Sequence, residues 1–387
     1  MKHSETDPAR GEKVKAVIVW IVTFVLSAAF IYGAHVYVSK GLKLLENTAG
    51  NIKAEVTELS ILYEETDPDT GYVQQTQYFR AKVLSGDMKG QSVDSYQQMD
   101  SYYETGERFV KVGDKVVLFD AGDGFYPFGS YARFDHVLIL GIIFLVLLIV
   151  FGRWKGLSTV VSLAFTCLAV FYVFLPAVLS GKNIYLWTVI VCIFTIVMTL
   201  LLTNSLTSKS VNTMLGCAFG VMTAGILEIV YDRIMHLTGV IDEHSIYLQI
   251  MNENGGSIDL KGLIFAMITI GAMGAVMDVA MDISSSLYEV HRHAPDISFR
   301  DLFKSGLNIG RDVMGTMANT LVLAYIGSSL CSILLRVSFS SSMLMMLNTE
   351  SICVELLQAI LGSLGILLTI PLTTLVCCIA YVKRTEE

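Results

Sequence analysis

The sequence is poor in charged residues. Only 16% of its 387 residues are Asp, Glu, Lys or Arg, whereas about 25% are charged in an ordinary soluble domain. No patch of clustered Lys and Arg interrupts the chain. A nucleic-acid partner is therefore excluded, because binding to a phosphate backbone needs a basic surface.

The hydrophilic part of the chain lacks cysteine. All seven cysteines lie in apolar runs: Cys167, Cys192, Cys217, Cys331, Cys353, Cys377 and Cys378. This distribution excludes a disulfide framework for the soluble segment. The chain also has no CxxC motif and no His/Cys pair at zinc-binding spacing. We therefore expect no metal site and no cofactor.

Motifs of common enzymes are missing as well. The chain contains no HExxH, no GxSxG, no phosphate-binding P-loop and no evident nucleophile–base pair. We therefore expect that the protein is not an enzyme and that it has no catalytic residues.

Long apolar runs dominate what is present, and 53% of the residues are hydrophobic. About 20 apolar residues cross the hydrocarbon core of a bilayer. After a polar N-terminus (1–15), residues 16–37 form one such run, too long for a signal peptide, so we predict an uncleaved anchor helix. Seven further runs predict a transmembrane domain over 137–382: 137–152, 157–180, 184–204, 211–235, 262–288, 306–333 and 352–382.

A soluble segment, 38–134, separates the anchor from the other runs. Residues 72–86 and 114–126 combine β-branched and aromatic residues with turn signals. They predict a small β-rich domain outside the cytoplasm. The fold class predicted is thus an α-helical polytopic membrane protein with about eight transmembrane helices and this domain after the first helix.

Lys and Arg residues predict the orientation. With the N-terminus inside, cytoplasmic segments, including a tail at 383–387, hold twelve of them: Lys2, Arg10, Lys13, Lys15, Arg153, Lys155, Lys209, Arg292, Arg300, Lys304, Lys383 and Arg384. Short outer segments hold four: Lys182, Arg233, Lys261 and Arg336. This asymmetry predicts a multi-pass protein of the cell (plasma) membrane with both termini in the cytoplasm.

Two of the apolar runs carry a polar stripe. At 100° per residue, the polar and small residues of each run fall within roughly 60–80° of one another, so each helix has one narrow polar face. In 270–289 the stripe comprises Gly271, Gly274, Asp278, Asp282 and Ser285. In 305–329 it comprises Asn308, Asp312, Gly315 and Asn319, flanked by Arg311 and Thr316.

The depth of these charges suggests a function. Asp282 and Arg311 would lie about 9 Å from the cytoplasmic end of their helices, and Asp278 about 15 Å. The matching depths predict that the two helices are antiparallel neighbours and that Asp282 pairs with Arg311, so that loss of Arg311 would destabilise the protein. A charge at the membrane centre costs at least about 2.5–3.5 kcal/mol, so these groups must face partners or water. The excess of acid over base favours a path for a cation or proton. The alternative is that Arg311 only joins two helices, with Gly271, Gly274, Gly310 and Gly315 allowing close approach.

Two other features are of interest. Glu228 lies deeper in the run 211–235 than the interfacial Asp232 and Arg233, and is a further ion-path candidate. Between the striped runs, residues near 295–304 have the apolar face of a short cytoplasmic surface helix.

The striped runs resemble a known family. The segments IDLKGLIFAMITIGAMGAVMDVAMDISSSLYEV and LFKSGLNIGRDVMGTMANTLVLAYIGSSL are similar to the signature of the YibE/F-like family of bacterial multispanning membrane proteins. The resemblance implies one anchor, an outer β domain and a multi-helix block. It leaves open a second membrane subunit of the same family or a homo-oligomer as partner, besides the lipid bilayer.

We therefore expect permease-like transport of an ion or small solute, with coupling to protons left open. Asp278, Asp282, Asn308, Arg311, Asp312, Asn319 and Glu228 are the candidate residues of the path. Two alternatives remain open. One is a non-transporting envelope component whose outer domain binds a partner. The other, by analogy of layout alone, is an accessory subunit like those of RND or SecDF systems.

Overall fold

The computed structural model describes residues 8–40, 50–66, 71, 73–100, 108–120, 124–253, 257–340 and 342–382. The predicted cytoplasmic tail at 383–387 and the first seven residues of the predicted N-terminal segment lie outside this part of the chain. The chain divides into two compact units, Lys43–Leu147 and Met1–Leu42 with Leu148–Glu387, and each is treated by itself.

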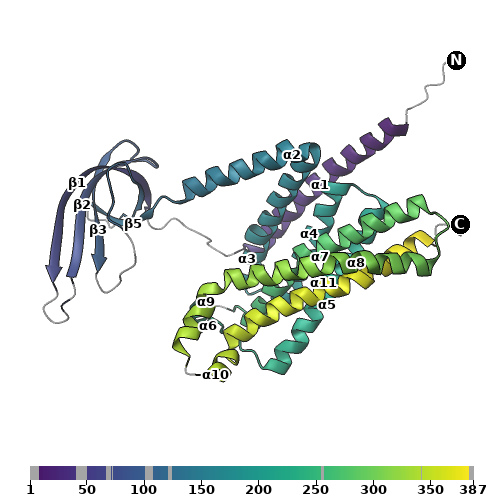
Figure 1. Ribbon diagram of the computed structural model, residues 1–387. Helices are drawn as coiled ribbons and strands as arrows, with labels where there is room; N and C mark the ends of the chain where they lie inside the picture. The colour runs from purple at the N-terminus through teal and green to yellow at the C-terminus, as the bar shows by residue number, and fades with distance from the viewer. Residues whose placement is uncertain are drawn as a thin grey trace, which may run out of the picture. The chain divides into compact units, whose positions relative to one another are not determined.

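The smaller unit is built on a closed β barrel, so the prediction of a small β domain is confirmed (Figure 1). The strands are β1 (Ile52–Thr66), β2 (Val73–Val83), β3 (Ser92–Asp100), β4 (Lys115–Leu118) and β5 (Phe125–Tyr131). They follow one another around the barrel in the order β1-β2-β3-β5-β4. All neighbours are antiparallel except β3 and β5. Alternate residues fill the core, among them Ala54, Val56, Phe79, Ala81, Val116 and Leu118.

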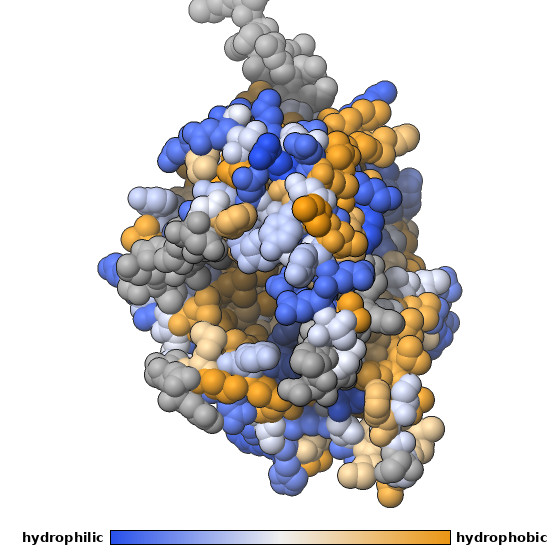
Figure 2. All heavy atoms as spheres, turned by 90° about the vertical axis from the view of Figure 1, so that its left-hand side faces the viewer, coloured by the Kyte–Doolittle hydropathy of each residue, from blue (hydrophilic) through white to orange (hydrophobic). Residues whose placement is uncertain are grey.

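Polar contacts join the last strand of the barrel to Arg108, and Arg108 to Asp114. The hydroxyl of Tyr131 donates a hydrogen bond of 2.6 Å to the carbonyl oxygen of Arg108, whose guanidinium contacts Asp114 at 3.3 Å. Burial, and then the negative charge of Asp114, raise the pKa of Tyr131 above its usual range. The phenol therefore keeps the proton that it donates. In the view of Figure 2, hydrophilic residues occupy much of the surface that faces the viewer.

The larger unit is helical (Figure 1). Its elements, with the start of α2 in the smaller unit, are α1 (Pro8–Val38), α2 (Phe134–Leu168), η1 (Ala169–Phe174, a π-helix), α3 (Leu175–Leu179), α4 (Ile184–Asn204), α5 (Ser208–Met235), α6 (Glu243–Glu253), α7 (Leu260–His293), α8 (Phe299–Ser328), α9 (Leu330–Phe339), α10 (Met343–Leu347) and α11 (Glu350–Val382).

In the described part of the chain, six helices are long and apolar enough to cross a membrane. The bent pair α8 and α9, which meet at 60°, would be a seventh. A multi-pass membrane protein is compatible with this finding, but the predicted count of about eight is not confirmed. The difference arises because the predicted spans 137–152 and 157–180 fall in one continuous helical stretch, Phe134–Leu179.

That stretch contains a sharp break at Arg153. The backbone of Arg153 has φ 50° and ψ −125°, outside the helical region, so α2 consists of two helical segments. The second segment begins in tight contact with the first. A Cβ atom at Gly156 would lie 2.0 Å from the carbonyl oxygen of Leu148, whereas a Cβ at Gly152 would meet nothing within 4 Å. The break therefore requires glycine at position 156.

The predicted surface helix near 295–304 is not a separate element. Residues 294–298 are non-helical, and Phe299 already belongs to α8, which continues without a break to Ser328. The hydroxyl of Ser298 accepts a hydrogen bond from the backbone N–H of Asp301 and so caps the helix. No proline or other helix-breaking residue follows before Ser305, so the segment merges with the next helix.

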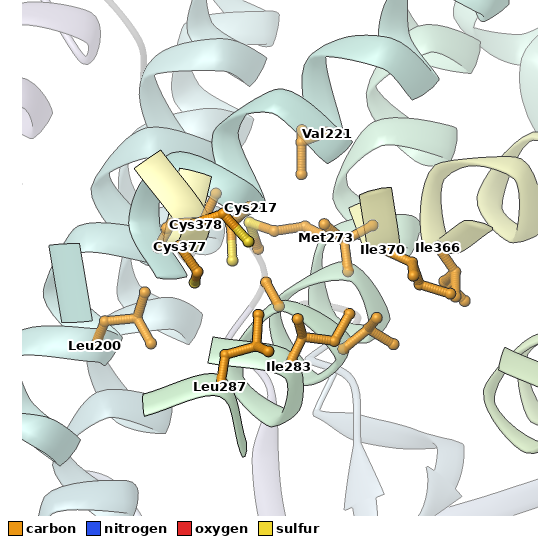
Figure 3. Close-up of a cluster of buried hydrophobic side chains, with 14 of the residues drawn as sticks. Leu200, Cys217, Val221, Met273, Ile283, Leu287, Ile366, Ile370, Cys377 and Cys378 are labelled. Atoms are coloured by element: carbon orange, nitrogen blue, oxygen red, sulfur yellow. The ribbon is translucent and has the colours of Figure 1, made fainter. Parts of the chain in front are cut away.

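A hydrophobic core joins α4, α5, α7 and α11 (Figure 3). Figure 3 shows Leu200, Cys217, Met273, Ile283 and Cys377 among the side chains gathered there. Helix α7 is central, because it contacts α4, α5, α8 and α11. The two polar stripes are thus carried by a central helix and its neighbour.

Candidate transmembrane site

The first stripe lies on one exposed face of α7. Asp259 caps this helix, since its carboxylate accepts hydrogen bonds of 3.1 Å from the backbone N–H groups of Lys261 and Gly262. The apolar face of α7, which includes Val276, Val279 and Ile283, is buried in the bundle. The remaining face carries Gly271, Gly274, Asp278 and Asp282, all of which are exposed.

Helix α8 packs against α11 and α7 through small residues. A Cβ at Gly306 would lie 2.4 Å from the Thr374 methyl carbon, and one at Gly310 would lie 2.1 Å from Ile370. At the other end of α8, the Tyr325 hydroxyl oxygen lies 2.4 Å from the position of a Cβ at Gly271. A Cβ at Gly306 would also lie 3.1 Å from Leu287 of α7. The start of α8 thus meets the end of α7, and the end of α8 meets the middle of α7 at Gly271, which confirms that the two helices are antiparallel neighbours.

The second stripe is also open to the outside of the chain. Asn308, Arg311, Asp312, Gly315 and Asn319 are all exposed. A Cβ at Gly315, like one at Gly274, would meet nothing within 4 Å. Gly271 and Gly310 therefore serve close packing, whereas Gly274 and Gly315 border open space.

Within the described residues, the stripe charges are not paired with one another. No ion pair or hydrogen bond is formed by the side chains of Asp278, Asp282, Arg311 and Asp312. The contact that was expected between Asp282 and Arg311 is thus absent within this part of the single chain.

A lysine that sequence patterns did not assign to this site lies near the acidic residues. Lys209, in the first turn of α5, interacts electrostatically with Asp282 and Glu289. The carbonyl oxygen of the same residue accepts a hydrogen bond of 3.1 Å from Ser284 on α7. The hydrophobic pattern placed Lys209 at a helix end, where basic residues are common, and gave no sign of this approach to α7.

Glu228 occupies a different environment from the stripe residues. Its side chain is only 2% exposed, and its Oε2 atom has no hydrogen-bond partner among the described residues. It interacts electrostatically with Asp232, one turn further along α5, and with Tyr185 at the start of α4. Burying a carboxylate without a partner is costly, so a compensating group or a bound proton is required.

Other buried polar atoms share this condition. Among the described residues, the hydroxyls of Thr269, Thr373 and Thr374 are buried without a hydrogen-bond partner. Each such group costs about 1–3 kcal/mol. They lie on α7 and α11, and sequence periodicity missed them because threonine and glycine are common in packed membrane helices.

One known protein family matches the part of the chain that runs from α2 through α11. A profile of YibE/F-like proteins matches residues 140–383, which include both striped helices, α5 and α11. No curated protein and no solved structure matches the chain. Because this match covers more than half of its length, the chain belongs to the YibE/F-like family.

Proposed function

We propose that the protein is a permease-like membrane subunit that moves an ion or a small solute along the stripes of α7 and α8. The observation that supports this function is that four charged residues are exposed on helices within the segment that matches the family: Asp278, Asp282, Arg311 and Asp312. Contact of these charges with hydrocarbon would cost several kcal/mol, so water or another polypeptide must cover them.

A second membrane chain covers the stripes in this proposal. It is either a second copy or another subunit of the same family, and the pathway runs along the interface. The wide, uncrowded positions at Gly274 and Gly315 leave room for water and solute there. The acidic excess favours a cation, and the proposal assigns no enzymatic activity to the protein.

The interface can be tested by cross-linking in native membranes. In a variant without its native cysteines, we expect Gly274→Cys and Gly315→Cys to form covalent dimers, or adducts with another chain, on addition of a bifunctional thiol reagent. Ile226→Cys is the matched control, because Ile226 is a 55% exposed residue on α5 outside the stripes. Cross-linking of the stripe positions no stronger than that of the control would contradict a protein interface.

We propose further that the chain crosses the plasma membrane eight times and has both termini in the cytoplasm. The break at Arg153 supports it, since the segment 134–152 is about 28 Å long, close to the thickness of the hydrocarbon core. We expect an impermeant thiol reagent to label Lys89→Cys but not His293→Cys in intact cells. Labelling of position 293 from outside would contradict the eight-crossing arrangement.

The competing function is that of an envelope component whose barrel binds a partner. In its favour, β1 pairs with β4 over Ile52–Glu55 alone, and beyond that point it exposes Leu59, Ile61, Leu62 and Tyr63. An unpaired strand edge with apolar side chains is suited to pairing with another chain. Solute transport by the purified protein distinguishes the two functions.

A further inference from the structure

A column of buried polar groups runs through the bundle, separate from the stripes. It follows three glycines of α5 that face threonine hydroxyls. A Cβ at Gly216 would lie 2.2 Å from Thr373 Oγ1, and a Cβ at Gly220 would lie 1.9 Å from Thr369 Oγ1. Further along, the Thr269 hydroxyl would lie 3.7 Å from a Cβ at Gly225. The hydroxyls thus come from α11 and then from α7.

Glu228 stands at the outer end of this column. It follows Gly225 by one helical turn, and a Cβ at Gly225 would lie 3.0 Å from the Phe265 ring of α7. The Phe265 ring also contacts Tyr185, with ring centroids 4.9 Å apart. The carboxylate is therefore placed between α4, α5 and α7, at the end of the row of hydroxyls.

Asn212 stands at the other end. It is 4% exposed, and its side chain is within hydrogen-bonding reach of the Tyr381 phenol on α11. It precedes Gly216 by one turn, on the same side of α5. Fully buried apolar residues such as Cys217, Val276 and Ile366 surround the column (Figure 3 shows Cys217 and Ile366), so it is insulated from lipid.

The unsatisfied atoms indicate what the column holds. Threonine in a membrane helix normally donates to the carbonyl four residues earlier, as Thr369 does to Gly365 at 2.7 Å. Thr269, Thr373 and Thr374 do not, so their hydroxyls are free to bond to water. Successive glycine–threonine contacts are four or five residues apart, which is a rise of about 6–7.5 Å along the axis of α5. Water molecules between the contacts would complete a row of hydrogen bonds.

We propose that this column conducts protons and that Glu228 is the group that carries the proton at its outer end. The carboxylate accepts a proton from a hydronium ion on the outer side and leaves a water molecule behind. It then gives the same proton to the adjacent water of the column and returns to its ionised form. Threonine hydroxyls and Asn212 orient the waters and are positioning residues.

A proton suits this column better than a metal ion. No group of three His, Cys, Asp or Glu side chains able to hold a metal occurs among the described residues. A carboxyl that becomes neutral on protonation also avoids a lasting charge in the bundle. Glu228 interacts electrostatically with Asp232 on α5 and with Tyr185 on α4. At the start of α7, Asp259 interacts with Tyr185, and Lys261 pairs with Asp232 at 3.7 Å.

At the level of Glu228, α11 presents apolar side chains, including the fully buried Leu361. The outer end of the column is therefore acidic, with Asp232 and Asp259 beside it and one lysine to offset them. This charge raises the local concentration of protons at the entrance. In the proposed function, this column is the route of the coupling proton. Proton conduction through the column rests on the proposed function only for the identity of the solute that is moved.

The experiment is proton flux in liposomes that contain the full chain, with an enclosed pH-sensitive dye and an imposed pH gradient. We expect Glu228→Gln to lower the flux at least about tenfold, and the nearly isosteric Thr373→Val to lower it severalfold. Glu289→Gln should leave it unchanged, because Glu289 is an exposed residue that pairs with Arg292 at the surface end of α7. Melting temperatures of all variants establish that they are folded.

A second measurement does not depend on transport. Infrared difference spectra between acid and alkaline pH should contain the absorption of a protonated, buried carboxyl group, and Glu228→Gln should remove it. Loss of this band and of flux supports the inference even if no solute is moved. Wild-type flux equal to that of empty liposomes, or flux in Glu228→Gln equal to that of the wild type, overturns it. Solute transport that persists in that second case leaves the proposed function standing.

Discussion

Asp278→Asn should abolish transport by the purified protein while leaving its fold intact. The carboxylate of Asp278 is exposed on α7 and, within the described residues, forms no ion pair that the substitution could break. Asparagine has nearly the same shape, but it lacks the negative charge that attracts a cation and takes up no proton at neutral pH. We therefore expect the transport rate to fall by at least about tenfold without a measurable change in melting temperature.

The measurement is uptake of alkali cations into liposomes with and without an imposed pH gradient. Asp296→Asn is the matched control, because it makes the same chemical change away from the stripes. Asp296 lies in the exposed connection between α7 and α8. Normal uptake by Asp278→Asn would remove the stripe from the pathway. Unfolding of the variant would instead favour a purely structural role for the acid.

Arg311→Ala has a smaller expected effect on stability than the sequence suggested. Removal of one partner from a buried ion pair costs about 3–5 kcal/mol, but Arg311 is exposed and has no acidic partner in the described part of the chain. Its role in the proposed function is therefore exerted at the interface with the second chain.

Gly156→Ala should severely destabilise the break in α2, whereas Gly152→Ala should be tolerated. The added Cβ at position 156 would lie 2.0 Å from the Leu148 carbonyl oxygen and 2.8 Å from its carbonyl carbon. These are backbone atoms, which cannot rotate away, so the two helical segments must separate. Overpacking of this kind costs about 1–3 kcal/mol or more. At position 152 nothing lies within 4 Å.

The comparison is informative because both variants replace glycine by alanine within one turn of Arg153. We expect Gly156→Ala to lower the yield of folded protein and its melting temperature, measured in detergent, by several degrees. Gly152→Ala should match the wild type. Equal behaviour of the two variants would show that the segments on either side of Arg153 are not held together at this point.

Sequence patterns predicted those parts of the structure that depend on local composition. The long apolar runs located the membrane helices, and clustered β-branched and aromatic residues located β2 and β4. The number of spans could not be derived, because hydropathy does not reveal that Arg153 breaks a continuous helix or that α8 bends by 60° into α9. Both events depend on tertiary packing.

The candidate site was accessible to sequence reasoning in part. Helical periodicity placed Asp278 and Asp312 on single faces of neighbouring helices, and the structure places both on exposed faces. Periodicity does not reveal what lies opposite such a face, so an enclosed pairing with Arg311 was expected. It also could not show that Lys209 comes close to Asp282, because nothing local couples α5 to α7.

The contacts between α5 and α11 restrict how this sequence can diverge. Gly216 with Thr373 and Gly220 with Thr369 fill their shared space so completely that a side chain on either glycine needs a smaller residue opposite. Substitutions at the members of each pair are therefore epistatic: one that is harmful alone becomes acceptable only with its counterpart. Membrane helices in contact along such a seam evolve as pairs of positions, and the α5–α11 seam can change only through compensated double substitutions.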